Sequence, residues 1–208
     1  MLAIKSVADL RTGDIGFSSI RGRVGAGVLA GQTSIDLAAL LRGRRVENAG
    51  WITHAFIVSQ SDYESAAIVE AMPSGARRVV LTGRDRIGPG YAYVRLPDEI
   101  GLIGWRTAAG ITAAKMVGTP YGFAQYAALA ALTLTGGNAA NAQGPLARYV
   151  NRRDPVTRHP VQMICSQLVD EVLRAVRVPL FKDGRPPQYV TPGALFWRAA
   201  QIGDVCIC

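Results

Sequence analysis

Residues that build disulfide frameworks and metal centres are scarce in this chain. Its 208 residues include three cysteines and two histidines. An odd number of cysteines does not fit a disulfide framework. Cys206 and Cys208 form a Cys-x-Cys pair, but no second cysteine pair accompanies them to complete the four ligands of a structural zinc site. We therefore expect no metal ion in the protein.

Long hydrophobic segments are absent as well. The longest apolar stretches, residues 28–41 and 124–134, are too short or too interrupted for the roughly 20 residues that cross a bilayer. Asp9 and Arg11 interrupt the N-terminal region before the apolar core of a Sec signal peptide can form. We expect no transmembrane segment and no Sec signal, and thus a cytoplasmic protein or one delivered by a phage particle or a secretion apparatus.

Lysine is nearly missing from a basic chain. Its 20 arginines and three lysines stand against 15 acidic residues, which gives a formal charge of +8. Such a charge suits nucleic acid, phosphates or an anionic membrane surface. The arginines are scattered, however, and the chain has no zinc-finger spacing and no basic motif interleaved with aromatic residues. We expect no nucleic-acid partner and leave an anionic surface open.

The composition is that of a folded domain. Hydrophobic residues make up 49% of the chain and charged residues 18%, and no low-complexity tract dominates. This balance excludes collagen, a coiled coil and a disordered activator, and it provides enough apolar side chain for one core. We expect a single domain over residues 1–208.

Strand and helix patterns divide the chain in the manner of an α+β fold. Short β-rich runs predict strands over 14–18, 52–60, 66–72, 77–82 and 91–96, with an antiparallel meander in the middle of the chain. Helical spacing predicts helices over 32–41, 100–118, 121–135, 165–176 and 192–200. Ser34 is the expected N-cap in the first helix. The polar stretch 136–160 predicts a loop or a lid.

Cys165 is a candidate nucleophile because it stands at the start of a predicted helix. The unpaired N–H groups and the dipole at a helix start favour a thiolate. Cys165 shares the direction of Val169 and Val172, so it faces the interior. A small buried hydrophobic residue is the alternative interpretation of such a cysteine.

His54 gains a candidate partner from the predicted hairpin. We expect Gln60 to pair with Ala66 across the five-residue turn between the two strands. That register places Phe56 opposite Glu70, which makes Glu70 the same-face diagonal neighbour of His54. A carboxylate on an apolar strand is costly unless it is paired, so the pairing explains both polar residues. A shift of one residue would turn Glu70 to the other face.

Six short motifs carry a resemblance to a known family. They occur in the order GDIGF, THAFIV, IVEA, PYGF, ICSQLV and TPGAL. This order resembles the circularly permuted papain-like branch of the NlpC-type hydrolases, the YiiX-like proteins, and more distantly lecithin:retinol acyltransferase. The resemblance spans residues 10–195. In papain the cysteine helix precedes the histidine strand, whereas here the histidine comes first, as in the permuted branch.

The resemblance implies a papain-like α+β domain in which an antiparallel sheet packs against the cysteine helix. It implies that Cys165 is the nucleophile, His54 the general base and then acid, and Glu70 the orienting residue. Tyr121, in the PYGF motif, is a candidate for lining the substrate site, and a half-buried tyrosine at a helix start is its alternative. No cofactor is implied.

Other polar residues receive no chemical role from the sequence. We expect Asp170 and Glu171 to lie on a solvated helix face and His159 to be exposed in its loop. Asp14 belongs to a turn that enters the first strand, and we assign it no chemistry.

The function expected from these features is that of a cysteine hydrolase. It would cleave an amide, in a cell-wall peptide or isopeptide, through an acyl-thioester intermediate. One alternative substrate is a lipid acyl ester or amide, with residues 123–134 lining an acyl groove. The other alternative is a structural or binding component of a phage particle or secretion apparatus, with little or no turnover.

Overall fold

The computed structural model describes residues 2–20, 22–41, 50–122 and 160–208, together with Ala124, Arg148, Arg152 and Arg153. Within them, the strands are β1 Ile15–Ser18, β2 His54–Ser61, β3 Ser65–Met72, β4 Gly75–Thr82, β5 Tyr91–Arg95 and β6 Asp204–Ile207. The α-helices are α1 Gly22–Leu40, α2 Trp105–Lys115, α5 Cys165–Ala175 and α6 Pro192–Ala200. Three short 3-10 helices are η1 Val7–Asp9, η2 Asp98–Ile100 and η3 Pro187–Tyr189.

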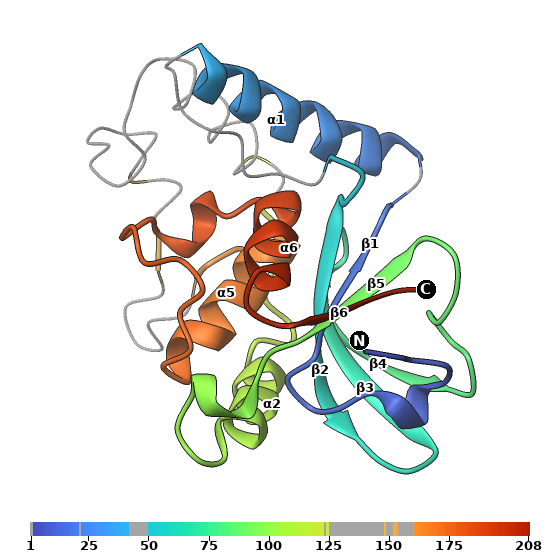
Figure 1. The fold of residues 1–208 in the computed structure, drawn as a ribbon. Coiled ribbons are helices and arrows are strands. Elements are labelled where there is room, and N and C mark those ends of the chain that lie inside the picture. The colour runs from blue at the N-terminus through green and yellow to red at the C-terminus, as the bar shows by residue number, and fades with distance from the viewer. Residues whose placement is uncertain are drawn as a thin grey trace.

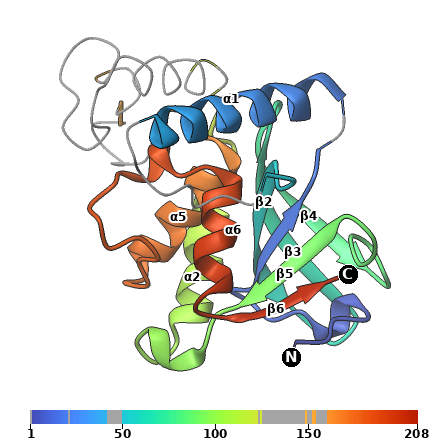
Figure 2. The same ribbon diagram turned by 45° about the horizontal axis from the view of Figure 1, so that its top comes forward.

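The strands form one antiparallel sheet in the order β4-β3-β2-β1-β5-β6. The helices α2, α5 and α6 lie on one side of this sheet, and α1 lies across its top (Figures 1 and 2). Both α2 and α5 contact β2, and α6 contacts β5. The arrangement is an α+β fold, as the sequence predicts.

Alternation along β2 and β3 fills two cores. Ala55, Ile57 and Val69 belong to the core beneath the helices, which also contains much of α5. Residues of the opposite parity, such as Phe56 and Ile68, pack on the other face of the sheet. The N-terminal segment covers this second face with Ile4, Val7 and Leu10. Because both faces of the sheet are covered, side chains in the middle of β2 and β3 are buried on both sides.

The register between β2 and β3 corrects one part of the sequence prediction. Phe56 lies opposite Glu70, as expected. Gln60, however, pairs with Ala67 rather than with Ala66, and the register shifts between Val58 and Gln60. A β-bulge inserts one extra residue into a strand. The bulge offsets the wrong turn pairing, so the predicted neighbours around the histidine remain correct.

The helix boundaries differ most at α1. It begins at Gly22, ten residues before the predicted start. Ser34 is not an N-cap, because its hydroxyl donates to the carbonyl of Ala30 within the helix at 2.8 Å. The glycines in the first turns lower helix propensity and concealed this start. A shorter difference occurs at α2, where η2 and the left-handed backbone of Gly104 replace its predicted first turn.

Three further points concern the edge of the sheet, the segment 121–160 and membrane-spanning helices. The sequence missed β6, which pairs with β5 along the sheet edge. The predicted helix 121–135 and the predicted loop or lid 136–160 lie almost entirely outside the described residues. No described helix combines the length and the apolar character required to cross a membrane.

Candidate functional site

Cys165 begins α5 directly after an extended residue. Ile164 has an extended backbone, with φ of −99° and ψ of 164°, so the chain changes from an extended segment to a helix at the cysteine. The Cys165 side chain receives backbone hydrogen bonds from Ala55 and Ser166. Burial raises the pKa of the Cys165 thiol, but the neighbouring His54 and these backbone groups outweigh it and lower the pKa below its ordinary value. The helix start therefore favours the thiolate.

The His54 ring lies between Cys165 and Glu70. Its Nε2 atom is 2.8 Å from Oε2 of Glu70. Its Nδ1 atom is buried and has no partner within the distance and angle limits of a hydrogen bond among the described residues. Cys165 interacts with the ring and helps to raise its pKa. Burial lowers the pKa of His54, but Cys165 and Glu70 outweigh this effect and raise the pKa to about 9. The pair is therefore stabilised as imidazolium and thiolate.

Glu70 is fully buried and is held by two arginines as well as by the histidine. Arg86 donates to Oε2 at 2.7 Å and to Oε1 at 2.8 Å. Arg77 donates to Oε1 through Nε at 3.0 Å and through Nη2 at 2.8 Å. Burial raises the pKa of Glu70, but His54 and Arg86 outweigh it and lower the pKa well below its usual range. The carboxylate is thus kept ionised in the interior.

Sequence reasoning missed both arginines. Arg77 lies directly opposite Glu70 in the pairing of β3 with β4, so extending the predicted meander by one hairpin could have found it. Arg86 comes from the turn between β4 and β5, where its φ is 57° and its guanidinium lies over the Phe56 ring. Tyr93 donates a hydrogen bond to the Arg86 carbonyl at 3.1 Å. No sequence signal places such a loop residue.

Tyr121 also lies against the thiol. It forms an isolated parallel bridge with Met163, two residues before the cysteine. Burial and the neighbouring Cys165 raise the pKa of the Tyr121 hydroxyl, which therefore remains protonated at neutral pH. Tyr121 also packs with Val28 and Ile164, which form a small cluster at the start of α5. The structure therefore brings all four sequence-predicted site residues together.

Asp170 corrects a prediction about the cysteine helix. We expected a solvated carboxylate, but Asp170 is fully buried and pairs with Arg174 at 2.7 Å. Burial raises its pKa above the ordinary value despite the arginine. Glu171 is bonded to Arg153 at 2.5 Å near the surface. His159 lies outside the described residues.

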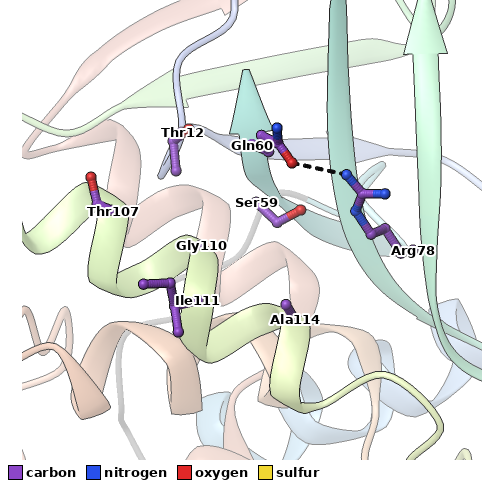
Figure 3. A pocket seen from close by; sticks show the side chains of 8 residues that line it. All are labelled: Thr12, Ser59, Gln60, Arg78, Thr107, Gly110, Ile111 and Ala114. Atoms are coloured by element: carbon purple, nitrogen blue, oxygen red, sulfur yellow. Dashed lines mark hydrogen bonds between the residues drawn. The ribbon is translucent and has the colours of Figure 1, made fainter. Parts of the chain in front are cut away.

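The thiol is closed off in this structure. Cys165 is 1% exposed and His54 is 2% exposed. A cavity of about 300 Å³ lies elsewhere, between α2 and the bulged part of β2. Figure 3 shows it, with a hydrogen bond of 3.0 Å from Arg78 to Gln60 at its wall. Its lining contains none of the residues that surround the thiol.

No known family model and no curated protein matches this chain. The chemistry of the site therefore follows from the geometry of its own residues. Among the described residues, no group of three or more His, Cys, Asp or Glu side chains could hold a metal ion. The site contains the Cys165–His54 pair, the Glu70 carboxylate with its two arginines and, beside the thiol, the Tyr121 hydroxyl.

Proposed function

We propose that this protein is a cysteine hydrolase that cleaves an amide bond through an acyl-thioester intermediate. One observation carries the proposal: a buried thiol at a helix start, an imidazole and an ionised carboxylate lie in series. Each group has the partner that its role requires, because Glu70 holds one nitrogen of His54 and leaves the other for Cys165. The raised pKa of His54 and the lowered pKa of Cys165 favour the reactive ion pair.

The reaction has two steps. The Cys165 thiolate attacks the amide carbonyl, and His54 gives its proton to the leaving amine as the C–N bond breaks. Neutral His54 then takes a proton from water, whose oxygen attacks the thioester. The acid leaves, and the thiolate and imidazolium are restored. Glu70 holds the ring in place through both steps.

Two further features support this chemistry. The backbone N–H of Cys165 lies at the start of α5, where a helix has unpaired N–H groups that can stabilise an oxyanion. The cysteine helix packs on an antiparallel sheet, which is the arrangement expected of a papain-like hydrolase. The motif order in the sequence supports a cell-wall peptide or a related isopeptide as substrate. Tyr121 is the proposed substrate-lining residue.

A binding or structural role with little turnover is the second candidate, and the burial of Cys165 favours it. A substrate must reach a thiol that is 1% exposed in this arrangement. Alkylation with iodoacetamide, resolved by cysteine, separates the two candidates. Activated Cys165 should react well below pH 8 and faster than Cys208, whose pKa is raised to about 11 by burial and by Cys206. Equal or slower reaction at Cys165 would favour the inert role.

Acyl-enzyme trapping tests the substrate. The protein is incubated in parallel with cell-wall muropeptides and with phospholipid, and its intact mass is followed. We expect acylation of Cys165 by muropeptides. Cys165→Ala should abolish turnover and keep the fold, whereas Cys206→Ala, the matched control, should keep both. Acylation by phospholipid alone would replace the amide proposal with lipid acyl hydrolysis.

A further inference from the structure

Among the described residues, the contacts of helix α1 with the rest of the molecule lie on one side of the helix. On that side, Val28 packs with Ile164 and Tyr121 at the start of the cysteine helix. Gln32 donates to the carbonyl of Ile52 at 2.9 Å and accepts a hydrogen bond from the backbone N–H of Gly193 at 2.9 Å. The buried Gln32 amide thus joins α1 to the segment just before β2 and to the first turn of α6. These contacts set which side of α1 faces outward.

Among the described side chains, the outward side carries no charge and is largely apolar. At 100° per residue, seven exposed positions fall within an arc of about 120°. We call them the outer face of α1: Ala26, Leu29, Ala30, Thr33, Leu37 and Leu40 of the helix, together with Leu41 directly after its end. The exposed fractions of Leu37, Leu40 and Leu41 are 54%, 59% and 79%. The Thr33 hydroxyl donates to the Leu29 carbonyl at 2.9 Å, so the only polar side chain of this face is already satisfied.

A helix that is apolar on two sides normally lies inside a core or in a lipid environment. Here the packing contacts that the described residues show are on the inner side, and four leucines are exposed on the other. The helix has 19 residues and lies along the edge of the molecule rather than projecting from it (Figures 1 and 2). It does not have the character of a membrane-spanning helix. This geometry suits a helix that lies on a bilayer surface.

The charges that accompany α1 in the sequence select the type of surface. Arg21 and Arg23 stand at its beginning, and three arginines, at positions 42, 44 and 45, follow within five residues of its end. Asp36 is the only acidic residue of α1. Arginines at both ends of an apolar helix are attracted to anionic headgroups. A second copy of the same face would bring basic ends together in either orientation, which disfavours self-association.

We propose that the outer face of α1 docks on the surface of a bilayer that carries anionic lipid. The leucines enter the boundary between headgroups and acyl chains, and the arginines flanking the helix in sequence provide the electrostatic attraction. This binding requires no turnover at Cys165, so it stands or falls independently of the proposed hydrolase activity.

Vesicle co-sedimentation tests the proposal with two lipid compositions, phosphatidylcholine alone and phosphatidylcholine mixed with phosphatidylglycerol. We expect the intact protein to bind the mixed vesicles and to be released by high salt. The double variant Leu37→Glu/Leu40→Glu should bind them on the order of tenfold more weakly or worse. Thermal unfolding checks its fold. Leu37→Gln/Leu40→Gln provides a milder substitution if the double glutamate variant does not fold.

Matched controls distinguish binding through this surface from nonspecific binding through other exposed hydrophobic residues. Ile103 is a fully exposed hydrophobic residue just before α2. Helix α2 lies at the opposite end of the molecule from α1 (Figure 1). Ile103→Glu and Cys165→Ala should both retain vesicle binding. Unchanged binding in both leucine variants, or absence of binding by the intact protein at low salt, would overturn the proposal. So would light scattering that shows a dimer which the leucine substitutions dissociate, because a second copy would then cover the face.

Discussion

Two fully buried carboxylates in this fold, Asp14 and Glu70, are each held by two arginines and differ in what else they contact. Asp14 pairs with Arg95 at 2.6 Å and with Arg106 at 3.5 Å, and it accepts a backbone hydrogen bond at 2.9 Å. Glu70 pairs with its own two arginines at 2.7 and 2.8 Å and also with the His54 ring. Asp14 precedes β1 and joins β5 to α2, whereas Glu70 lies within β3 beside the thiol.

Asp14 joins elements of the fold, whereas Glu70 also contacts the histidine of the proposed chemistry. A buried carboxylate needs hydrogen-bonded counter-charges, and two arginines provide them in both places. The imidazole is what distinguishes Glu70, because it links the carboxylate to a thiol. Asp14 therefore acts as an internal control: it is also buried and paired with two arginines, but it has no imidazole partner and no part in the proposed chemistry.

The largest expected effect is the loss of turnover on removal of His54, which links Glu70 to Cys165. His54→Ala removes the imidazole and leaves both arginine-bound carboxylates in place. Because general acid–base catalysis contributes about 10²- to 10⁴-fold, we expect turnover of the muropeptide substrate to fall by that range. Initial rates per folded molecule measure the loss. A rate within a factor of about two of the intact protein would remove His54 from the proposed mechanism.

Asp14→Asn should have the opposite result: it should lower the stability of the fold and leave turnover unchanged. The substitution leaves Arg95 and Arg106 without their buried counter-charge, which typically costs about 3 to 5 kcal/mol of stability. Turnover per folded molecule should stay unchanged, because Asp14 contacts none of the thiol, His54 or Glu70. Urea unfolding gives the free energy of unfolding of the variant. Active-site titration gives the fraction of molecules that are folded. Loss of turnover in the folded protein would mean that the two carboxylates are not separate devices.

Glu70→Gln should lower turnover less than His54→Ala does, by about tenfold, because an amide can still bond to the ring. The pH profile carries a sharper prediction. His54 acts as the acid while it is protonated, so turnover should decline as pH rises through about 9. Removing the carboxylate removes an interaction that raises this pKa, so the alkaline decline should move to lower pH. Full activity with an unchanged profile would show that Glu70 does not orient the ring.

The smallest effect should distinguish the two arginines of Glu70. The Arg86 side chain is 19% exposed and the Arg77 side chain 49%. Arg86→Met should cost about 1.5 to 3 kcal/mol, the range for hydrogen bonds to a charged group. Arg77→Met should cost less than about 1 kcal/mol, because water screens an exposed pair. Equal losses in urea unfolding would contradict this order.

Local patterns in the sequence predicted much of the central sheet. Alternation and turn residues predicted β2 and β3, and the opposition of Phe56 to Glu70 was correct even though the turn pairing was not. The bulge at Ser59 could not be predicted, because it depends on how the strand fits its neighbours. Gly110 of α2 illustrates this fit: a Cβ there would come within 2.1 Å of the Ser59 carbonyl oxygen.

Predictions failed where contacts between distant segments decide the outcome. β6 is a short strand whose pairing with β5 is not encoded locally. The start of α1 is glycine-rich, so its helical state depends on packing rather than on propensity. Asp170 looked like a surface residue because its acidic neighbour Glu171 suggested a solvated face. Packing of the whole helix buries it instead.

The sequence by itself determined the chemical inventory and its order along the chain: a histidine in a strand, a glutamate on the next strand and a cysteine at the beginning of a helix. Periodicity and helix-start electrostatics are local, so these features could be recognised without a fold. Only the tertiary structure decided that Arg86 reaches Glu70, that the thiol is closed to solvent and that four leucines of one α1 face are exposed. Each depends on which distant surfaces meet, and burial is a property of the packed molecule rather than of any segment.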